Sequence, residues 1–303
     1  MVEMVEVLEA LRGLELVNDE VEGGWPSPPD PEQAHRADPR QTGRGRQPTE
    51  LPPDLAGELE SLARLDDEEQ SPELLDRLAW YAPLHFAGDR WGIYITEDAV
   101  VRVAGRICGH LSGRQVTDPD IAVEALRCAF RTLYFHEAFH HCTESFAIRL
   151  ELTQKVERYR TYHRDVYHRD VYHRPSNPDQ PLEEALACAD MMRRQTMGRG
   201  STPVSGAVRR ATVKMLEAWI PCLPNGYRQG LDFVEDAKFN EGKDHLSAMV
   251  QQGDGWDPDD VRRWGMVAVH HRGGMFRALG ACEEHTHLVT SGATPRLPVL
   301  LSN

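Results

Sequence analysis

The strongest constraint on this fold is a long helical pattern that begins at Asp118 and continues to about Thr153. Asp118 is a typical N-cap residue, and Pro119 suits the first turn, where a missing N–H costs nothing. At about 100° per residue, one apolar stripe separates from the rest of the helix surface and predicts a core-facing side. The stripe consists of Cys128, Phe135, Phe139, Cys142, Phe146 and Leu150.

A different sector of the same helix carries the pattern His-Glu-x-x-His, at His136, Glu137 and His140. Residues four apart lie one turn apart on one face, so the two imidazoles can hold one metal ion between them. Glu137 is then placed to act as a general base on water activated by the metal. A catalytic zinc takes three protein ligands and keeps one position open, so the pattern predicts a zinc site with one further ligand.

Three acids are candidates for contacts at such a site. Glu144 lies eight residues after His136, about 12 Å along the helix axis, so it cannot share an ion with both histidines. We expect it instead to form a hydrogen bond with one of the ligand side chains. Glu183 and Glu184 lie on a second predicted helix that begins after Pro181. Either of these two glutamates could close the site from across a cleft.

With these residues the chain resembles the gluzincin group of zinc metallopeptidases, whose third ligand is a Glu on a later helix. In thermolysin-like members, an Asp four positions after that Glu orients the first histidine. The resemblance implies that Glu184 is the third ligand and puts Cys188 in the place of the Asp. Asp190 or Glu144 is then a further candidate to contact the histidine.

The order of strand, helix, motif helix and later Glu helix is also similar to the compact ImmA/IrrE-type peptidases. Leu186 stands at a position where those peptidases usually have Asn or Asp. The resemblance covers about Trp91 to Met192. It implies a zincin-like core, a peptide or protein substrate and zinc-assisted amide hydrolysis. The oxyanion-stabilising donor stays open among Tyr159, Tyr162, Tyr167, Tyr172, His270 and His271.

The remaining patterns predict an α+β, mostly helical fold with a small sheet packed on the motif helix. We expect a short helix and a disordered linker over 1–54, because residues 23–53 are rich in Pro, Gly and charge. The metallopeptidase core is expected over 55–200, with a short strand at 91–95. A helical region with short strands near 267–271 and 285–289 is expected over 201–303, and His285 and His287 would share one strand face.

A five-residue unit, Tyr-His-Arg-Asp-Val, is repeated from Tyr162 to Arg174. Histidines five apart scatter around an α-helix, so an inserted solvated loop is favoured over a histidine-rich metal box.

Composition restricts the possible partners. The net charge of -14 argues against a general nucleic-acid binder, although a basic run extends from Arg193 to Lys214. No apolar run approaches the ~18 residues of a membrane span, and six scattered cysteines favour reduced thiols and a cytoplasmic protein. The alternative to an enzyme is a non-catalytic module that zinc stabilises for binding or regulation. The oligomeric state is left open.

Overall fold

The computed structural model describes residues 3–17, 27–40, 52–64, 78–111, 118–167, 181–196, 204–252, 276–292 and 294–301. Within these ranges the chain is mostly helical, with one small mixed sheet, as the sequence predicts. The principal helices are α1 (Met4–Gly13), α2 (Pro53–Leu62), α4 (Leu84–Ala87), α5 (Glu97–Gly109), α7 (Pro119–Gln154), α8 (Tyr159–Tyr162), α9 (Leu182–Thr196), α10 (Gly206–Trp219) and α11 (Asp236–Gln252). The strands are β1 (Ala34–Arg36), β2 (Ala79–Ala82), β3 (Gly92–Thr96) and β4 (Thr286–Val289).

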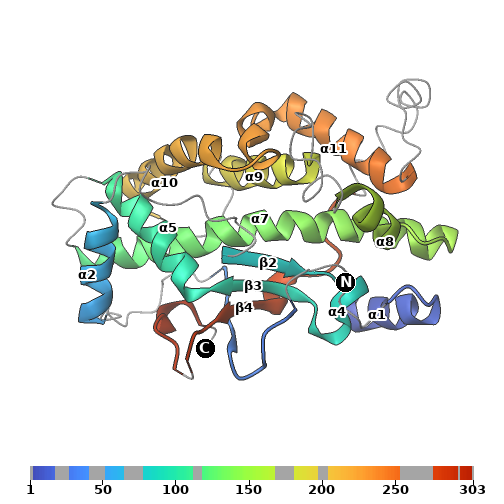
Figure 1. The fold of residues 1–303 in the computed structure, drawn as a ribbon, viewed down its shortest axis with the longest axis horizontal. Helices are drawn as coiled ribbons and strands as arrows, with labels where there is room; N and C mark the ends of the chain where they lie inside the picture. The colour runs from blue at the N-terminus through green and yellow to red at the C-terminus, as the bar shows by residue number, and fades with distance from the viewer. Residues whose placement is uncertain are drawn as a thin grey trace.

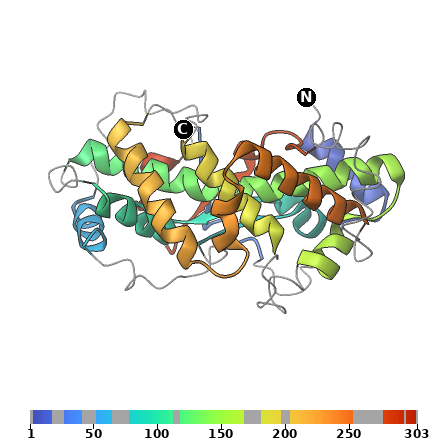
Figure 2. The same cartoon turned by 90° about the horizontal axis from the view of Figure 1, so that it is seen from above.

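Helix α7 runs through the middle of the fold, along its longest dimension (Figure 1). Its predicted cap is confirmed, because the Asp118 carboxylate accepts a hydrogen bond from the backbone N–H of Asp120 at 3.0 Å. Thr96 caps the preceding helix α5 in the same way, accepting from the N–H of Ala99 at 3.2 Å. The 36-residue helix α7 ends where Lys155 adopts a left-handed conformation with φ of 57°. The sheet lies on one side of α7, and α9, α10 and α11 cover the other, as Figure 2 also shows.

The sheet has the order β1-β4-β3-β2. The central strands β3 and β4 are parallel, whereas β1 and β2 pair antiparallel with their neighbours. The prediction of a disordered linker is wrong at residues 34–36, which form β1 and align His35 with Leu288. Strand pairing with a distant segment stabilises these residues, and local composition does not report it.

The other helices and strands expected from the sequence are partly confirmed. Helix α1 forms and buries Val7, Leu8 and Leu11 in the main core. The strand expected near 285–289 forms as β4. Residues 72–80 have a helical pattern in the sequence, but Ala79 and Trp80 lie in strand β2. The strand expected near 267–271 lies outside the described residues.

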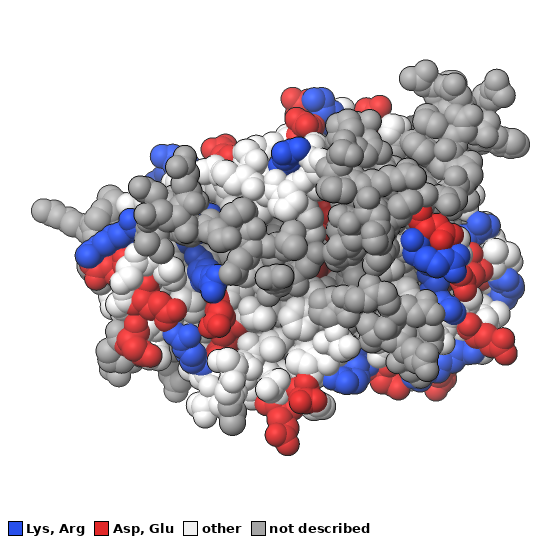
Figure 3. All heavy atoms as spheres, in the orientation of Figure 1, with Lys and Arg blue, Asp and Glu red and all other residues white. Residues whose placement is uncertain are grey.

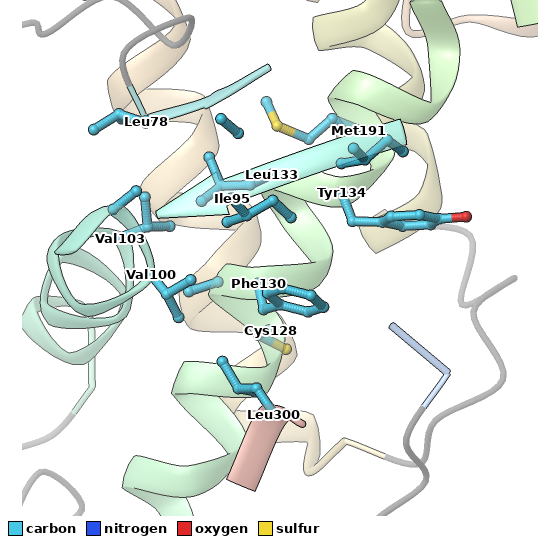
Figure 4. Packing of buried hydrophobic residues seen from close by; sticks show 14 of the residues in the cluster. Leu78, Ile95, Val100, Val103, Cys128, Phe130, Leu133, Tyr134, Met191 and Leu300 are labelled. Atoms are coloured by element: carbon cyan, nitrogen blue, oxygen red, sulfur yellow. The ribbon is translucent and has the colours of Figure 1, made fainter. Parts of the chain in front are cut away.

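Helix α7 contributes more residues to the core than the predicted stripe alone. Leu133 and Phe130 of α7 pack with Ile95 of β3 and Val100 of α5, and all four are 1% exposed or less (Figure 4). A second cluster, shared with α9 and α11, includes Phe139, Phe146 and Leu150 of the predicted stripe. The stripe residues Phe135 and Cys142 are only half-buried. A helix covered by a sheet on one side and helices on the other is buried around most of its circumference, which one amphipathic stripe does not anticipate.

Membrane crossing requires a helix that is both long and apolar, and none of the helices in the described ranges meets that requirement.

Candidate metal centre

Helices α7 and α9 bring the three predicted metal-binding residues together. The Nε2 atom of His136 lies 3.1 Å from Oε2 of Glu184, and the Nε2 atom of His140 lies 3.6 Å from the same oxygen. One potential ligand atom from each residue lies within 4.8 Å of the others. All three residues are buried, with exposed fractions of 5% or less for the whole residue. The two nitrogens and one carboxylate oxygen therefore form a donor set that suits a divalent transition-metal ion.

Small residues allow this convergence. Ala185, Ala187 and Ala189 of α9 are all buried, so their short side chains let α9 approach its neighbours closely. Gly230, in the 3-10 segment η5 (Tyr227–Phe233), packs against the other side of α9, where an added Cβ would lie 2.5 Å from Cβ of Cys188. This close packing holds the first two turns of α9 in place, and with them the acids at its N-terminal end.

The ring nitrogens that face away from Glu184 also have partners. Nδ1 of His140 lies 2.8 Å from Oε1 of Glu183, and Nδ1 of His136 lies 3.8 Å from the Cys188 sulfur. Such contacts fix the orientation of a ligand histidine and decide which nitrogen is left for the metal. Glu183 therefore contacts the second histidine rather than sharing the three-residue cluster. Cys188 contacts the first histidine, from the position where the resemblance places an Asp.

The electrostatics of the cluster favour bound positive charge. Burial alone would raise the pKa of Glu184, but the neighbouring His140 and His136 lower it to about 2. Burial alone would lower the pKa of His140, but Glu184, Glu183 and Glu137 raise it to about 9. Burial alone would also lower the pKa of His136, but Cys188, Glu184 and the buried Glu137 raise it. The acids around the two imidazoles thus create a strongly negative potential at this point.

Two tyrosines of the five-residue repeat close the glutamate side of the cluster. The hydroxyl of Tyr162 donates to Oε2 of Glu183 at 2.6 Å, and that of Tyr167 donates to Oε1 of Glu184. The prediction of a solvated loop is wrong for this first repeat unit, because Tyr162, His163 and Tyr167 are all buried. The segment η2 (His163–Tyr167) is a π-helix, and its hydrogen bonds join residues five apart. The repeat length of five was a signal for this geometry, but periodicity tests for α-helix and strand do not detect it.

Two predicted supporting residues lie elsewhere. Asp190 pairs with Nε of Arg194 at 3.0 Å. Glu144 accepts hydrogen bonds from Tyr81, from the backbone N–H groups of Leu84 and His85, and from the His85 ring. The contacts of both acids thus fall outside the cluster, because Glu144 lies a full turn beyond His140 on α7 and Asp190 lies well beyond Glu184 on α9.

Of the other oxyanion candidates, Tyr159 packs its ring on His85 and Phe86. Tyr172, His270 and His271 lie outside the described residues.

The remaining histidine and arginine candidates also have other surroundings. His285 stacks on Trp91 at a centroid distance of 4.0 Å, and His287 stacks on Tyr94 at 5.1 Å. Arg193 pairs with Asp236, and Arg194 with Asp190, so both cations already have acidic partners. On the described part of the face in Figure 3, basic and acidic side chains are interspersed.

Comparisons with protein-family models, with curated proteins and with solved structures gave no match. The assignment of this site therefore depends on its own residues and geometry.

Replacing Glu183 by glutamine is expected to weaken metal binding about 10- to 100-fold, because the negative charge that orients His140 is lost. Competition with a chromophoric chelator would measure the change in affinity. Asp190→Asn is the matched control on the same helix, since Asp190 pairs with Arg194, and we expect it to leave the affinity within about twofold. Equal affinities for wild type and Glu183→Gln would show that Glu183 does not support the site.

A second buried cluster lies further along α7. The His85 ring is held between Oε1 of Glu144 at 2.6 Å and Oε2 of Glu151 at 2.8 Å, and all three side chains are fully buried. Burial alone would lower the pKa of His85, but Glu151 and Glu144 raise it to about 9. The charged His85 therefore ties the short helix α4 to α7.

This cluster predicts an alkaline loss of stability. The stabilisation from protonated His85 is complete below its unfolded pKa of 6.5 and is lost as the pH rises through about 9. The shift corresponds to about 3 kcal/mol in the free energy of unfolding. Urea unfolding should show the difference between wild type and His85→Gln shrinking by about that amount across this pH window. A difference that stays constant with pH would contradict a charged His85.

Proposed function

We propose that this chain is a zinc-dependent metallopeptidase, which hydrolyses peptide bonds of a peptide or protein substrate. The observation that carries the proposal is the convergence of His136, His140 and Glu184, with the buried Glu137 between the two histidines in sequence. The donor set of two imidazoles and one carboxylate suits zinc in a catalytic site. A zinc ion held there supplies a Lewis acid that polarises a carbonyl oxygen and lowers the pKa of water.

The residues around the donor set have distinct roles in this proposal. Glu137 takes a proton from the attacking water and passes it to the leaving amine. Glu183 and Cys188 hold the rings of His140 and His136, so that both Nε2 atoms face the same point. The negative potential around the histidines favours a cation over a neutral ligand.

The proposal also includes a cytoplasmic location and the absence of a nucleic-acid partner. The six cysteines are free, and Cys108 and Cys128 are buried thiols with raised pKa values because of that burial. Unpaired thiols of this kind fit a cytoplasmic protein. A nucleic-acid partner is disfavoured by the net charge of -14 and by the acidic partners of Arg193 and Arg194.

The second candidate function is a non-catalytic module in which the same zinc site stabilises a binding or regulatory surface. The complete burial of Glu184, beneath the hydroxyl of Tyr167, favours this candidate.

The two candidates differ in a direct assay. Purified protein loaded with zinc would be incubated with a mixture of unstructured peptides, and new amino termini would be counted by mass spectrometry. The peptidase predicts cleavage that a chelator stops and added zinc restores. Stoichiometric zinc without cleavage would favour the binding module, and failure to bind any divalent metal would remove both candidates.

A further inference from the structure

Tyr162, the last residue of α8, and Tyr167, the last residue of η2, contact different glutamates. Tyr162 and Tyr167 are five residues apart and only 2% and 4% exposed. The hydroxyl of Tyr162 donates to Glu183, the glutamate that orients His140, whereas the hydroxyl of Tyr167 donates to Glu184, the glutamate that faces both histidines. One short segment therefore reaches both acids of the proposed metal site.

The two oxygen atoms of each carboxylate have different contacts. In Glu183, Oε1 faces Nδ1 of His140 and Oε2 accepts from Tyr162. In Glu184, Oε2 faces both histidine Nε2 atoms and Oε1 accepts from Tyr167. Each hydroxyl thus holds the oxygen that points away from the histidines, and in doing so fixes the direction of the other oxygen.

The spacing of five is what allows this arrangement. In an α-helix, residues five apart point about 140° away from each other, so two such tyrosines could not both face α9. A π-helix joins residues five apart by its hydrogen bonds, which places them one above the other on the same face. The segment that links Tyr162 to Tyr167 is π-helical, and its length equals the five-residue repeat.

We propose that Tyr162 and Tyr167 are positioning residues for the metal site, and that the five-residue repeat sets their spacing. They form a pair of hydroxyl groups that hold Glu183 and Glu184 in the orientation that metal binding requires. This inference rests on the proposed metal site, but it makes a separate claim about the repeat. The first unit of the repeat then sets the distance between the two hydroxyl groups.

Tyrosine-to-phenylalanine variants test the hydroxyl groups. Tyr162→Phe and Tyr167→Phe should each lower zinc affinity about 10- to 100-fold in a chelator competition. Tyr167→Phe should also change the visible absorption of the cobalt-substituted protein, because the hydroxyl acts on a ligand carboxylate. Tyr159→Phe is the control from the same segment, since its buried ring packs on His85 and Phe86, and it should leave both readouts unchanged.

Two insertions test the spacing. One alanine added between Asp165 and Val166 separates the two tyrosines by six positions and should lower zinc affinity as Tyr167→Phe does. A complete extra Tyr-His-Arg-Asp-Val unit added after Val166 keeps a tyrosine five positions after Tyr162, and lengthening a connection costs little. This variant should keep the wild-type affinity.

The outcomes separate this inference from the function it rests on. Wild-type protein that binds no zinc would remove the metal site and this inference together. Wild-type zinc binding with unchanged affinity in both phenylalanine variants would overturn the positioning role alone. Equal affinities for the two insertion variants would overturn the role of the five-residue spacing.

Discussion

Glu137→Gln is expected to keep its zinc and to hydrolyse peptides about 10²- to 10⁴-fold more slowly than the wild type, the range that a lost general base produces. Glutamine has nearly the same shape as glutamate, so the buried position at Glu137 stays filled. Its amide cannot take a proton from water near neutral pH, whereas a carboxylate can. The loss should therefore appear in kcat more than in KM.

The control for this prediction is the metal content of the same preparation. Glu137→Gln should contain as much zinc per chain as the wild type, because Glu137 is not one of the three clustered donors. Asp190→Asn is the matched acid-to-amide control on α9 and should retain hydrolysis. Wild-type rates in Glu137→Gln, with zinc present, would exclude Glu137 as the base.

Glu151→Ala is expected to cost about 3–5 kcal/mol in the free energy of unfolding, the range for breaking one side of a buried ion pair. Its carboxylate contacts the ring of His85 and also accepts hydrogen bonds from the backbone N–H groups of Arg158 and Tyr159. Alanine would leave the buried His85 without one of its two acidic partners. Such a loss is a large fraction of the roughly 5–15 kcal/mol that stabilises a typical domain.

Urea unfolding would measure this effect, with Glu157→Ala as the matched control. Glu157 lies just after the end of α7 and pairs with Arg160 at 3.5 Å, but both side chains are partly exposed. An exposed pair of this kind contributes about 0–1 kcal/mol. A Glu151→Ala variant no less stable than Glu157→Ala would show that the His85 cluster does not hold the fold together.

Sequence patterns predicted the parts of this fold that depend on local chemistry. The Asp118 cap and the long helix α7 follow from short-range rules. The placement of His136 and His140 on one face follows from helix geometry alone. Local patterns failed at β1, where residues 34–36 are ordered by pairing with β4, a strand about 250 residues later in the chain.

The three converging metal donors could be predicted from the sequence. The hydrogen-bond partners of the neighbouring acids could not. The sequence leaves Glu183 open as a metal ligand, whereas in the structure its carboxylate contacts Nδ1 of His140. Glu144 was expected behind a ligand, but it binds the His85 region instead. Both acids lie on the predicted helices, and only the packing of those helices decides which neighbour each carboxylate meets.

The repeat shows a different limit of sequence patterns. Its period of five matches neither an α-helix nor a strand, and so the pattern alone indicates a solvated loop. In the structure, the first unit forms a π-helix whose tyrosines reach Glu183 and Glu184. π-helices are rare and frequently occur at functional sites, so a five-residue period next to candidate ligands is a useful signal.

The most direct test of the account is the metal content of purified protein, wild type against His140→Ala and Glu184→Ala, measured by elemental analysis after growth with zinc. The convergence of His136, His140 and Glu184 predicts about one zinc per wild-type chain and little in either variant. Circular dichroism of the variants would establish that they are folded. Zinc retained at the wild-type level in folded Glu184→Ala, or a wild-type chain that binds no divalent metal, would contradict the account.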